Sequence, residues 1–445
     1  MSELKQKYGL FTAIAMIVGV CIGSGIFFKS DNILIATNGS ISLGVLMFAV
    51  AAISVVFGGL TVSYLAQKTD KSGGIITYAE EFCSKKTACV FGWFQAFIYY
   101  PALVAVVAWV LGVYVCILFN MPAIFEIQML IGGIFCAVCF IYNVFLASVG
   151  GILQNVATVI KLVPLILIAL FGFAWGNPMA ALENISAEPI MGIGWLAAVG
   201  PVAFSFDGWI ISTSLAHEIK NSKKNMSIAL IVAPIIIFVV YVVYFVGITS
   251  YVGVDTVIAM GDNHVAYAAA KMFGDLFAKA ITIFIIISVM GTINGVVMGY
   301  IRIPYSLALR DKMIPLQEKL KKVNPKLDIP VNSAVFAFCT VVIWGIIHYI
   351  THKFSLLKNS DVSEISIAVS YLLYIVIYMS VIRHNYKSAQ KSIFKGYVCP
   401  VLATLGSVLI LVGVMQNVLF VFYAMLSFMV ILVSIFYYNH KSVGF

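Results

Sequence analysis

Ile22-Gly23-Ser24-Gly25-Ile26-Phe27 lies in the middle of the first apolar stretch of this chain, and Phe204-Ser205-Phe206-Asp207-Gly208-Trp209 lies in the middle of the sixth. We name these segments the first break and the second break. A helix in hydrocarbon is interrupted only where the freed backbone groups line a cavity or meet a ligand. Paired interruptions at matching places in two halves of a chain are typical of a transporter's substrate site.

The composition indicates an integral membrane protein. Of the 445 residues, 62% are hydrophobic and 10% are charged, whereas a soluble domain carries roughly a quarter charged residues. Between residues 87 and 182 the only Asp, Glu, Lys or Arg residues are Glu126 and Lys161. That stretch is long enough for three membrane spans of about 20 residues each. Water-soluble classes of protein are thereby excluded.

Apolar runs between polar interruptions predict an all-α chain with twelve spans. The predicted spans are 10–29, 41–66, 89–118, 127–149, 153–175, 191–216, 228–251, 274–308, 331–350, 363–382, 397–416 and 418–438. The whole chain, residues 1–445, is expected to form a single transmembrane domain. None of the eight cysteines is expected to form a disulfide staple, and no metal-ligand spacing is present.

The distribution of Lys and Arg predicts the orientation. If the amino terminus is cytoplasmic, 20 of the 27 basic residues fall on inner segments and four, among them Lys29 and Lys353, on outer ones. The remaining three, Lys161, Lys279 and Arg302, lie within spans. The positive-inside rule therefore places both termini in the cytoplasm. The net charge of +9 is spread over short inner loops, which does not fit nucleic-acid binding.

Small residues in the first break have two interpretations. They could simply allow close helix packing. Ser24 at mid-membrane depth, with Asp207 and flanking aromatic residues at the matching depth of the sixth span, favours a binding site instead.

An opened turn in the first break would expose backbone groups that suit an amino acid. The amides of Ser24, Gly25 and Ile26, at the positive end of the following half-helix, would bind a carboxylate. Freed carbonyls near Cys21 and Phe204 would accept from an ammonium group. Together they suit a zwitterionic head group.

Lys161 stands alone in the fifth span, three residues before Pro164. A charged residue at the centre of a span costs about 2.5–3.5 kcal/mol on insertion scales, so it needs a partner or a function. We expect a fixed cation that ties the first span to the eighth through carbonyls and hydroxyls. Snorkelling and proton carriage are the alternatives.

Other polar and aromatic residues have candidate roles. Asp207 is expected to cap the second half-helix, although it could instead contact the substrate. The aromatic residues of the second break, Phe204, Phe206 and Trp209, are expected to cover the site. Arg302 and Glu218 are expected to form an inner-gate charge network, with surface snorkelling as the alternative for each.

The chain resembles the amino acid–polyamine–organocation superfamily, and within it the L-amino-acid-transporter-like bacterial branch. The resemblance runs in order along the chain through 22–27, Tyr99-Tyr100-Pro101-Ala102, 206–209, Glu218-Ile219-Lys220-Asn221-Ser222, Gly291-Thr292-Ile293-Asn294-Gly295, Arg302 and Ala308-Leu309-Arg310-Asp311. It implies the leucine-transporter fold: a five-plus-five inverted repeat, about 10–175 and 191–383, followed by trailing helices at about 397–438.

The resemblance also implies roles for individual residues. The substrate-binding residues would be Cys21, Ile22, Ser24, Gly25, Ile26, Phe204, Phe206 and Asp207. The gating or coupling residues would be Lys161, Tyr241, Phe204, Trp209, Asn294 and Arg302. Lys161 would occupy the place of a sodium ion in sodium-coupled relatives, with Tyr241 as a partner.

Two departures from the family pattern bear on partners and on the pocket. Animal members that join a glycoprotein chain use a cysteine in the outer loop after the third span, but the segment from Phe119 to Glu126 has none. A disulfide-linked partner is therefore not expected. Cys21 replaces a branched apolar residue, which alters the size of the pocket.

The sequence predicts a sodium-independent exchanger of neutral L-amino acids in the plasma membrane, working by alternating access. Small substrates such as alanine, serine or threonine are favoured, and no cofactor or metal is expected. The alternative is a proton-coupled symporter of amino acids or polyamines, although a polyamine has no carboxylate for the amides. An intramembrane enzyme would need paired aspartates, a Ser/His pair or a HExxH helix, and none is present. A channel would show rings of pore-lining polar residues, and the sequence has none of these. A sensor that binds amino acids without transporting them stays an open alternative.

Overall fold

The computed structural model of the chain is built from helices. It describes residues 9–69, 74–146, 156–183, 193–211, 213, 219–327, 329–357, 361–417 and 420–443. Within these ranges, ten helices are long and apolar enough to cross a membrane, and the bent pair in the first span makes eleven. The all-α membrane fold is confirmed, whereas the predicted number of twelve spans is not established.

The helices follow the predicted spans closely. The first half of the chain holds α1 (Leu10–Cys21), α2 (Ser24–Ala36), α3 (Ile41–Ala66), α4 (Gly74–Phe82), α5 (Lys85–Phe94), α6 (Tyr100–Leu118), α7 (Phe125–Phe145), α9 (Leu162–Trp175), α10 (Pro178–Glu183) and α11 (Val199–Phe206). The second half holds α12 (Ser222–Val252), α13 (Val254–Met260), α14 (His264–Phe273), α15 (Asp275–Ala308), α16 (Gln317–Leu320), α17 (Val331–Lys353), α18 (Val362–Lys387), α19 (Cys399–Val414) and α20 (Phe420–Val443).

The first and sixth spans differ from continuous helices. The first reaches Ala36 and bends by 48° between α1 and α2. The sixth is represented by a 3₁₀ turn, Gly194–Ala198, and the short helix α11. Residues 212 and 214–218, which include the end of this predicted span, lie outside the described residues.

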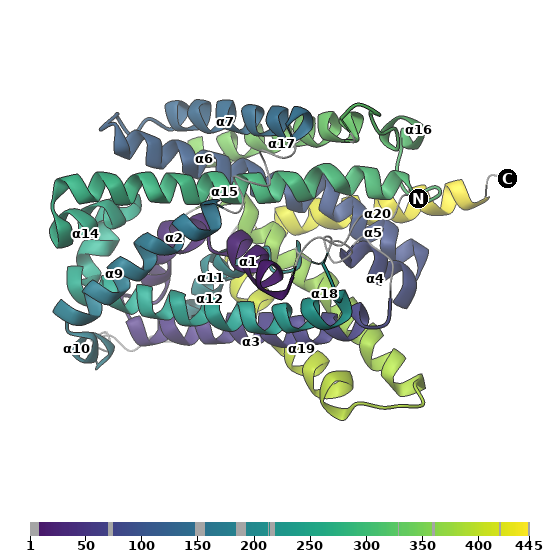
Figure 1. Ribbon diagram of the computed structural model, residues 1–445, viewed down its shortest axis with the longest axis horizontal. Helices are drawn as coiled ribbons and strands as arrows, with labels where there is room; N and C mark the ends of the chain where they lie inside the picture. The colour runs from purple at the N-terminus through teal and green to yellow at the C-terminus, as the bar shows by residue number, and fades with distance from the viewer. Residues whose placement is uncertain are drawn as a thin grey trace.

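The interrupted helices occupy the middle of the molecule. Figure 1 shows α15 running along most of its length, α3 and α12 along the other side, and α1, α2 and α11 between them. α1 packs against α12 and α15, and α2 packs against α11. Long continuous helices thus hold the two broken ones in place, so that the breaks lie inside protein rather than in lipid.

Glycines set the closest helix packing between α6 and α7. A Cβ added to Gly112 would lie 1.9 Å from the carbonyl oxygen of Gln128, and one added to Gly132 would lie 2.0 Å from that of Ala108. The two backbones therefore touch directly, as small residues allow in membrane helices. Gly133, the next residue, has nothing within 4 Å of such a Cβ.

Adjacent glycines in α7 provide a matched test of this packing. We expect Gly132→Ala to lower the midpoint of thermal unfolding in detergent, because overpacking costs about 1–3 kcal/mol. Gly133→Ala should leave the midpoint unchanged or raise it, since alanine is the better helix former. Equal effects of the two substitutions would show that the α6–α7 contact is looser than described.

Candidate functional site

The first break separates α1 from α2 over two residues. α1 ends at Cys21, and Ile22 is extended, with φ −74° and ψ 97°. α2 begins at Ser24, so the amides of Ser24, Gly25 and Ile26 belong to its first turn. Amides in a first turn have no acceptor within their own helix, and the helix dipole adds positive potential there. The predicted interruption of the first span is confirmed, because its helix ends at Cys21 and a second one begins at Ser24.

The second break follows the end of α11. Phe206 is the last residue of this helix, and Asp207 is extended, with ψ 157°. Gly208 has φ +94°, and a Cβ on it would lie 2.6 Å from Cγ1 of Val20. Glycine is the residue that adopts this backbone conformation without strain, and it also lets α1 approach.

The two breaks meet each other in the middle of the structure. A Cβ added to Gly25 would lie 2.6 Å from Cα of Ser205. The hydroxyl of Tyr241 on α12 lies 2.9 Å from the carbonyl oxygen of Cys21 and 2.8 Å from that of Ser205. A single phenol from a continuous helix thus serves backbone carbonyls of both breaks.

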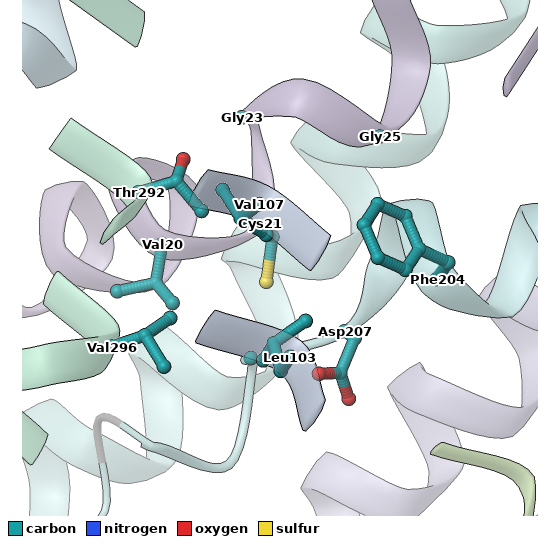
Figure 2. Close-up of a pocket in the computed structure, with 11 residues that line it drawn as sticks. Val20, Cys21, Gly23, Gly25, Leu103, Val107, Phe204, Asp207, Thr292 and Val296 are labelled. Carbon is teal, nitrogen blue, oxygen red and sulfur yellow. The ribbon is translucent and has the colours of Figure 1, made fainter. Parts of the chain in front are cut away.

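A small cavity lies between the breaks (Figure 2). Its volume is about 20 Å³, which is room for about one water molecule. The lining residues are Val20, Cys21, Gly23, Gly25, Leu103, Val107, Phe204, Asp207, Gly208, Thr292 and Val296. Four of the predicted substrate residues therefore line one cavity: Cys21, Gly25, Phe204 and Asp207. The prediction did not include four other lining residues: Leu103, Val107, Thr292 and Val296.

Asp207 brings a carboxylate to the cavity. Its Oδ2 accepts a hydrogen bond of 2.6 Å from the hydroxyl of Tyr99. Tyr99 closes a π-helical turn, Gln95–Tyr99, that joins α5 to α6. Such turns are frequent at functional sites. Asp207 is the residue after α11, and the half-helix it was predicted to cap lies partly outside the described residues.

Lys161 reaches the first span. Its side chain is fully buried, and Nζ donates to the carbonyl oxygen of Gly19 in α1. A Cβ on Gly291 of α15 would lie 3.9 Å from the same nitrogen. The ammonium therefore lies between α1 and α15. The Tyr241 hydroxyl bonds to the carbonyl oxygens of Cys21 and Ser205, so Tyr241 and Lys161 reach α1 at different points.

The remaining predicted aromatic residues lie outside the cavity wall. Phe206 is buried against Phe48 and Tyr241, with ring centroids 6.4 Å and 5.3 Å away. Trp209 is buried with its ring centroid 6.0 Å from that of Tyr374. These side chains pack the second break against its scaffold, whereas Phe204 faces the cavity.

The predicted polar gating residues have separate environments. Oδ1 of Asn294 accepts from the Tyr142 hydroxyl at 3.0 Å and from the Asn143 amide at 2.9 Å, which links α15 to α7. Arg302 donates to the carbonyl oxygen of Met298 at 2.7 Å. Glu218, its expected partner, lies outside the described residues.

Lys29 is a buried charged residue that the sequence reasoning misplaced. It was assigned to an outer segment, but it is buried in α2 and pairs with Asp361 and Glu364. A signal was present in the sequence, because two acids three residues apart, Asp361 and Glu364, flank the start of the tenth predicted span. Within the described residues, no group of three His, Cys, Asp or Glu side chains is arranged to hold a metal ion.

Comparisons with known proteins agree with this architecture. A family model described as amino acid permease matches residues 8–441. The serine/threonine exchanger SteT of Bacillus subtilis is 28% identical over 413 residues, covering 92% of this chain and 91% of SteT. The b(0,+)-type amino acid transporter 1 of Homo sapiens is 26% identical over 427 residues, covering 93% of this chain and 83% of the relative.

A third relative is the large neutral amino acids transporter small subunit 2 of Mus musculus, which is 27% identical over 346 residues, 75% of this chain and 63% of its own length. These matches confirm the resemblance on which the site residues were assigned. The chain belongs to the amino acid permease family, whose members are transporters and not enzymes.

Proposed function

We propose that this protein carries neutral L-amino acids across the plasma membrane without sodium, as an exchanger that works by alternating access. Small substrates such as alanine, serine and threonine are favoured. The observation that carries the proposal is the meeting of two broken helices at one small cavity, with the first turn of α2 beside it.

The breaks supply groups for both ends of an amino acid's backbone. The amides of Ser24, Gly25 and Ile26 would bind the α-carboxylate, helped by the dipole of α2. The carbonyls of Cys21, Ile22, Phe204 and Asp207 would accept from the α-ammonium group. The bond from Tyr241 to Cys21 is compatible with this role, since a carbonyl oxygen has two lone pairs.

The cavity wall favours a small, uncharged side chain. Val20, Leu103, Val107 and Val296 make much of it apolar. The polar exceptions are the hydroxyl of Thr292 and the carboxylate of Asp207, which already accepts a hydrogen bond from Tyr99. A short hydroxyl or methyl substituent suits such a wall, although the breaks must move apart to admit a whole amino acid, because the cavity has room for about one water molecule. The name of the serine/threonine exchanger SteT supports this size class.

Lys161 supports independence from sodium. Its buried amino group lies between α1 and α15, and in its protonated form it supplies a positive charge there. A sodium ion bound beside it would meet a like charge in a medium of low dielectric, which is unfavourable. We propose that Lys161 replaces a coupling ion and stabilises the bent first span.

The wider setting of the proposal follows the family. Both termini would be cytoplasmic, because basic residues concentrate on the segments that this orientation places inside. The two repeats, about 10–175 and 191–383, would rock against each other around the fixed breaks. A disulfide-linked partner is not proposed, because residues 119–126 contain no cysteine.

Exchange is tested with purified protein in liposomes. We expect uptake of labelled serine or alanine only when the liposomes contain an unlabelled neutral amino acid, with no need for sodium or a pH gradient. Uptake into empty liposomes that requires an inward proton gradient would instead establish the proton-coupled symporter.

Gly25→Val tests the binding site. The added Cβ would lie 2.6 Å from Cα of Ser205, so the breaks would have to separate. We expect serine to lose its ability to raise the unfolding temperature, with exchange falling by about 100-fold or more. Gly133→Val is the matched control, since a Cβ there meets open space. Ligand-induced stabilisation that survives in Gly25→Val would place the site elsewhere.

Lys161→Ala tests the buried cation. Removing the ammonium leaves the Gly19 carbonyl without its donor, which costs about 1–3 kcal/mol, and we expect exchange to fall by about 10- to 100-fold. Lys279→Ala, which removes an exposed lysine from α15, should leave exchange unchanged. Sodium-dependent recovery of exchange in Lys161→Ala would directly support the replacement of an ion, whereas full activity would contradict any role.

A further inference from the structure

The connection between α18 and α19 carries a run of basic residues. Four of them recur at every fourth position: Arg383, Lys387, Lys391 and Lys395. No Asp or Glu occurs between residues 365 and 445. α18 ends at Lys387, and a π-helical turn, Phe394–Val398, leads into α19. We name residues 383–395 the basic loop. Its charge is not offset by acids from its own part of the chain.

Acids from neighbouring elements do not neutralise the basic loop either. α18 packs against α4, which contributes Glu80 and Glu81. Glu80 is already paired with Arg310 at 2.7 Å. By contrast, the long basic segment 310–328 mixes six basic residues with three acids of its own. The basic loop therefore keeps a surplus of positive charge that other basic segments share less.

The basic loop lies at the end of the molecule that the proposed orientation puts in the cytoplasm. His384 packs against Tyr64 near the end of α3 and against Phe82 at the end of α4, with ring centroids 6.1 Å and 5.4 Å away. Figure 1 shows α4 and α16 at one end of the molecule and α10 and α14 at the other. Residues 388–393 alone separate α18 from the next candidate span. A connection this short between two spans lies at the membrane surface, beside the lipid headgroups.

One side-chain amide gives the basic loop a fixed shape. The Asn385 side chain is fully buried, and its Nδ2 donates to the carbonyl oxygen of Ser392 at 3.1 Å. Its Oδ1 accepts from the backbone amide of the same serine at 3.0 Å. A Cβ added to Gly396 would lie 2.2 Å from Cγ of Asn385, so the chain also packs closely against this amide. The basic side chains thus project from an ordered backbone, which lowers the entropy cost of gathering them around one ligand.

Exposed apolar side chains accompany the charges. Tyr386 is 70% exposed, Ile393 is 75% exposed and Phe394 is 53% exposed. Nζ of Lys391 lies 5.3 Å from the ring centroid of Tyr386, so charge and aromatic surface are adjacent. A soluble anion would not use this apolar surface. In a bilayer, the apolar side chains would contact the upper parts of the acyl chains, while the basic groups reach the phosphate.

We infer that the basic loop binds the headgroup of an anionic phospholipid in the cytoplasmic leaflet. Arg383, Lys387 and Lys391 are exposed and would contact the phosphate, with the arginine able to donate two parallel hydrogen bonds. The inference rests on the proposed orientation and is independent of the substrate and of the mode of transport.

A lipid bound here would act on the candidate site through α18. This helix packs against α11, and the ring of its Tyr374 lies with its centroid 6.0 Å from that of Trp209 in the second break. A lipid that fixes the cytoplasmic end of α18 steadies the helix against which the second break packs. We therefore expect exchange to be faster when anionic lipid is present.

Native mass spectrometry tests the binding directly. The purified protein in detergent micelles would be titrated with phosphatidylglycerol or with phosphatidylcholine of the same acyl chains, and the retained lipid would be counted. We expect preferential retention of phosphatidylglycerol. Replacement of Arg383, Lys387 and Lys391 together by glutamine should raise the apparent dissociation constant for phosphatidylglycerol by about 100-fold, since each basic residue near an anionic surface contributes about 5-fold.

A matched control removes the same charge from segment 310–328. Replacement of the exposed Lys319, Lys322 and Lys326 by glutamine should leave retention of phosphatidylglycerol unchanged. Both triple variants alter exposed side chains, so their unfolding midpoints without added lipid should match that of the unaltered protein.

Three results would overturn the inference. Equal losses of phosphatidylglycerol in the two triple variants would show that the basic loop is not the site. Equal retention of both lipids by the unaltered protein would exclude a preference for anionic headgroups. Displacement of phosphatidylglycerol by an equal concentration of inorganic phosphate would identify the occupant as a soluble anion.

Liposomes test the effect on transport. Exchange would be compared in phosphatidylcholine alone and with added phosphatidylglycerol, which is present in both leaflets, so that the direction of insertion does not matter. We expect the anionic lipid to raise exchange by about 5-fold or more in the unaltered protein and in the control variant, but not in the variant of the basic loop. An equal gain in all three proteins would overturn the action through α18. Absence of exchange in every lipid would contradict the proposed transport, whereas lipid retention is decided separately by mass spectrometry.

Discussion

The structure depends on one constraint: a backbone group that is freed within the membrane must find a partner inside the protein. Each interruption here is served by a side chain from another span. Tyr241 reaches the carbonyls of Cys21 and Ser205, and Lys161 reaches that of Gly19. The amides in the first turn of α2 are donors that lack an acceptor in their own helix, and a substrate carboxylate would supply one. Backbone groups freed at the breaks thus serve both purposes: side chains of the protein bind some of them, and the substrate would bind the others.

Sequence reasoning was effective where the membrane imposes a strong rule. Span positions, the first break and the placement of Lys161 followed from hydrophobic length and from the cost of an isolated charge. It was weaker where a contact joins distant segments. Lys29 was counted with the outer segments, and the acids that pair with it, Asp361 and Glu364, lie more than 330 residues away along the chain. Thr292 gave no signal of its own, since a threonine in an apolar helix usually bonds to its own backbone, as this one does to Ser288.

The aromatic residues of the second break show another limit. Phe204 and Phe206 are two residues apart, and composition alone could not decide which faces the cavity. Because a helix turns about 100° per residue, residues two apart point to nearly opposite sides. Phe204 lines the cavity, so Phe206 packs against Phe48 and Tyr241 instead. Knowing the direction of one side chain would have fixed the other.

Two buried lysines flank the first break, and their partners suggest a division of labour. Lys161 donates to a backbone carbonyl of α1, a partner that has no formal charge and belongs to the bent span itself. Lys29 pairs with carboxylates on a different helix. Separating an ion pair is possible when water replaces each partner, whereas the Gly19 carbonyl would stay buried and lose its donor. The geometry therefore suits Lys161 to a lasting tie to the bent span, whereas Lys29 joins two helices that lie far apart in the sequence.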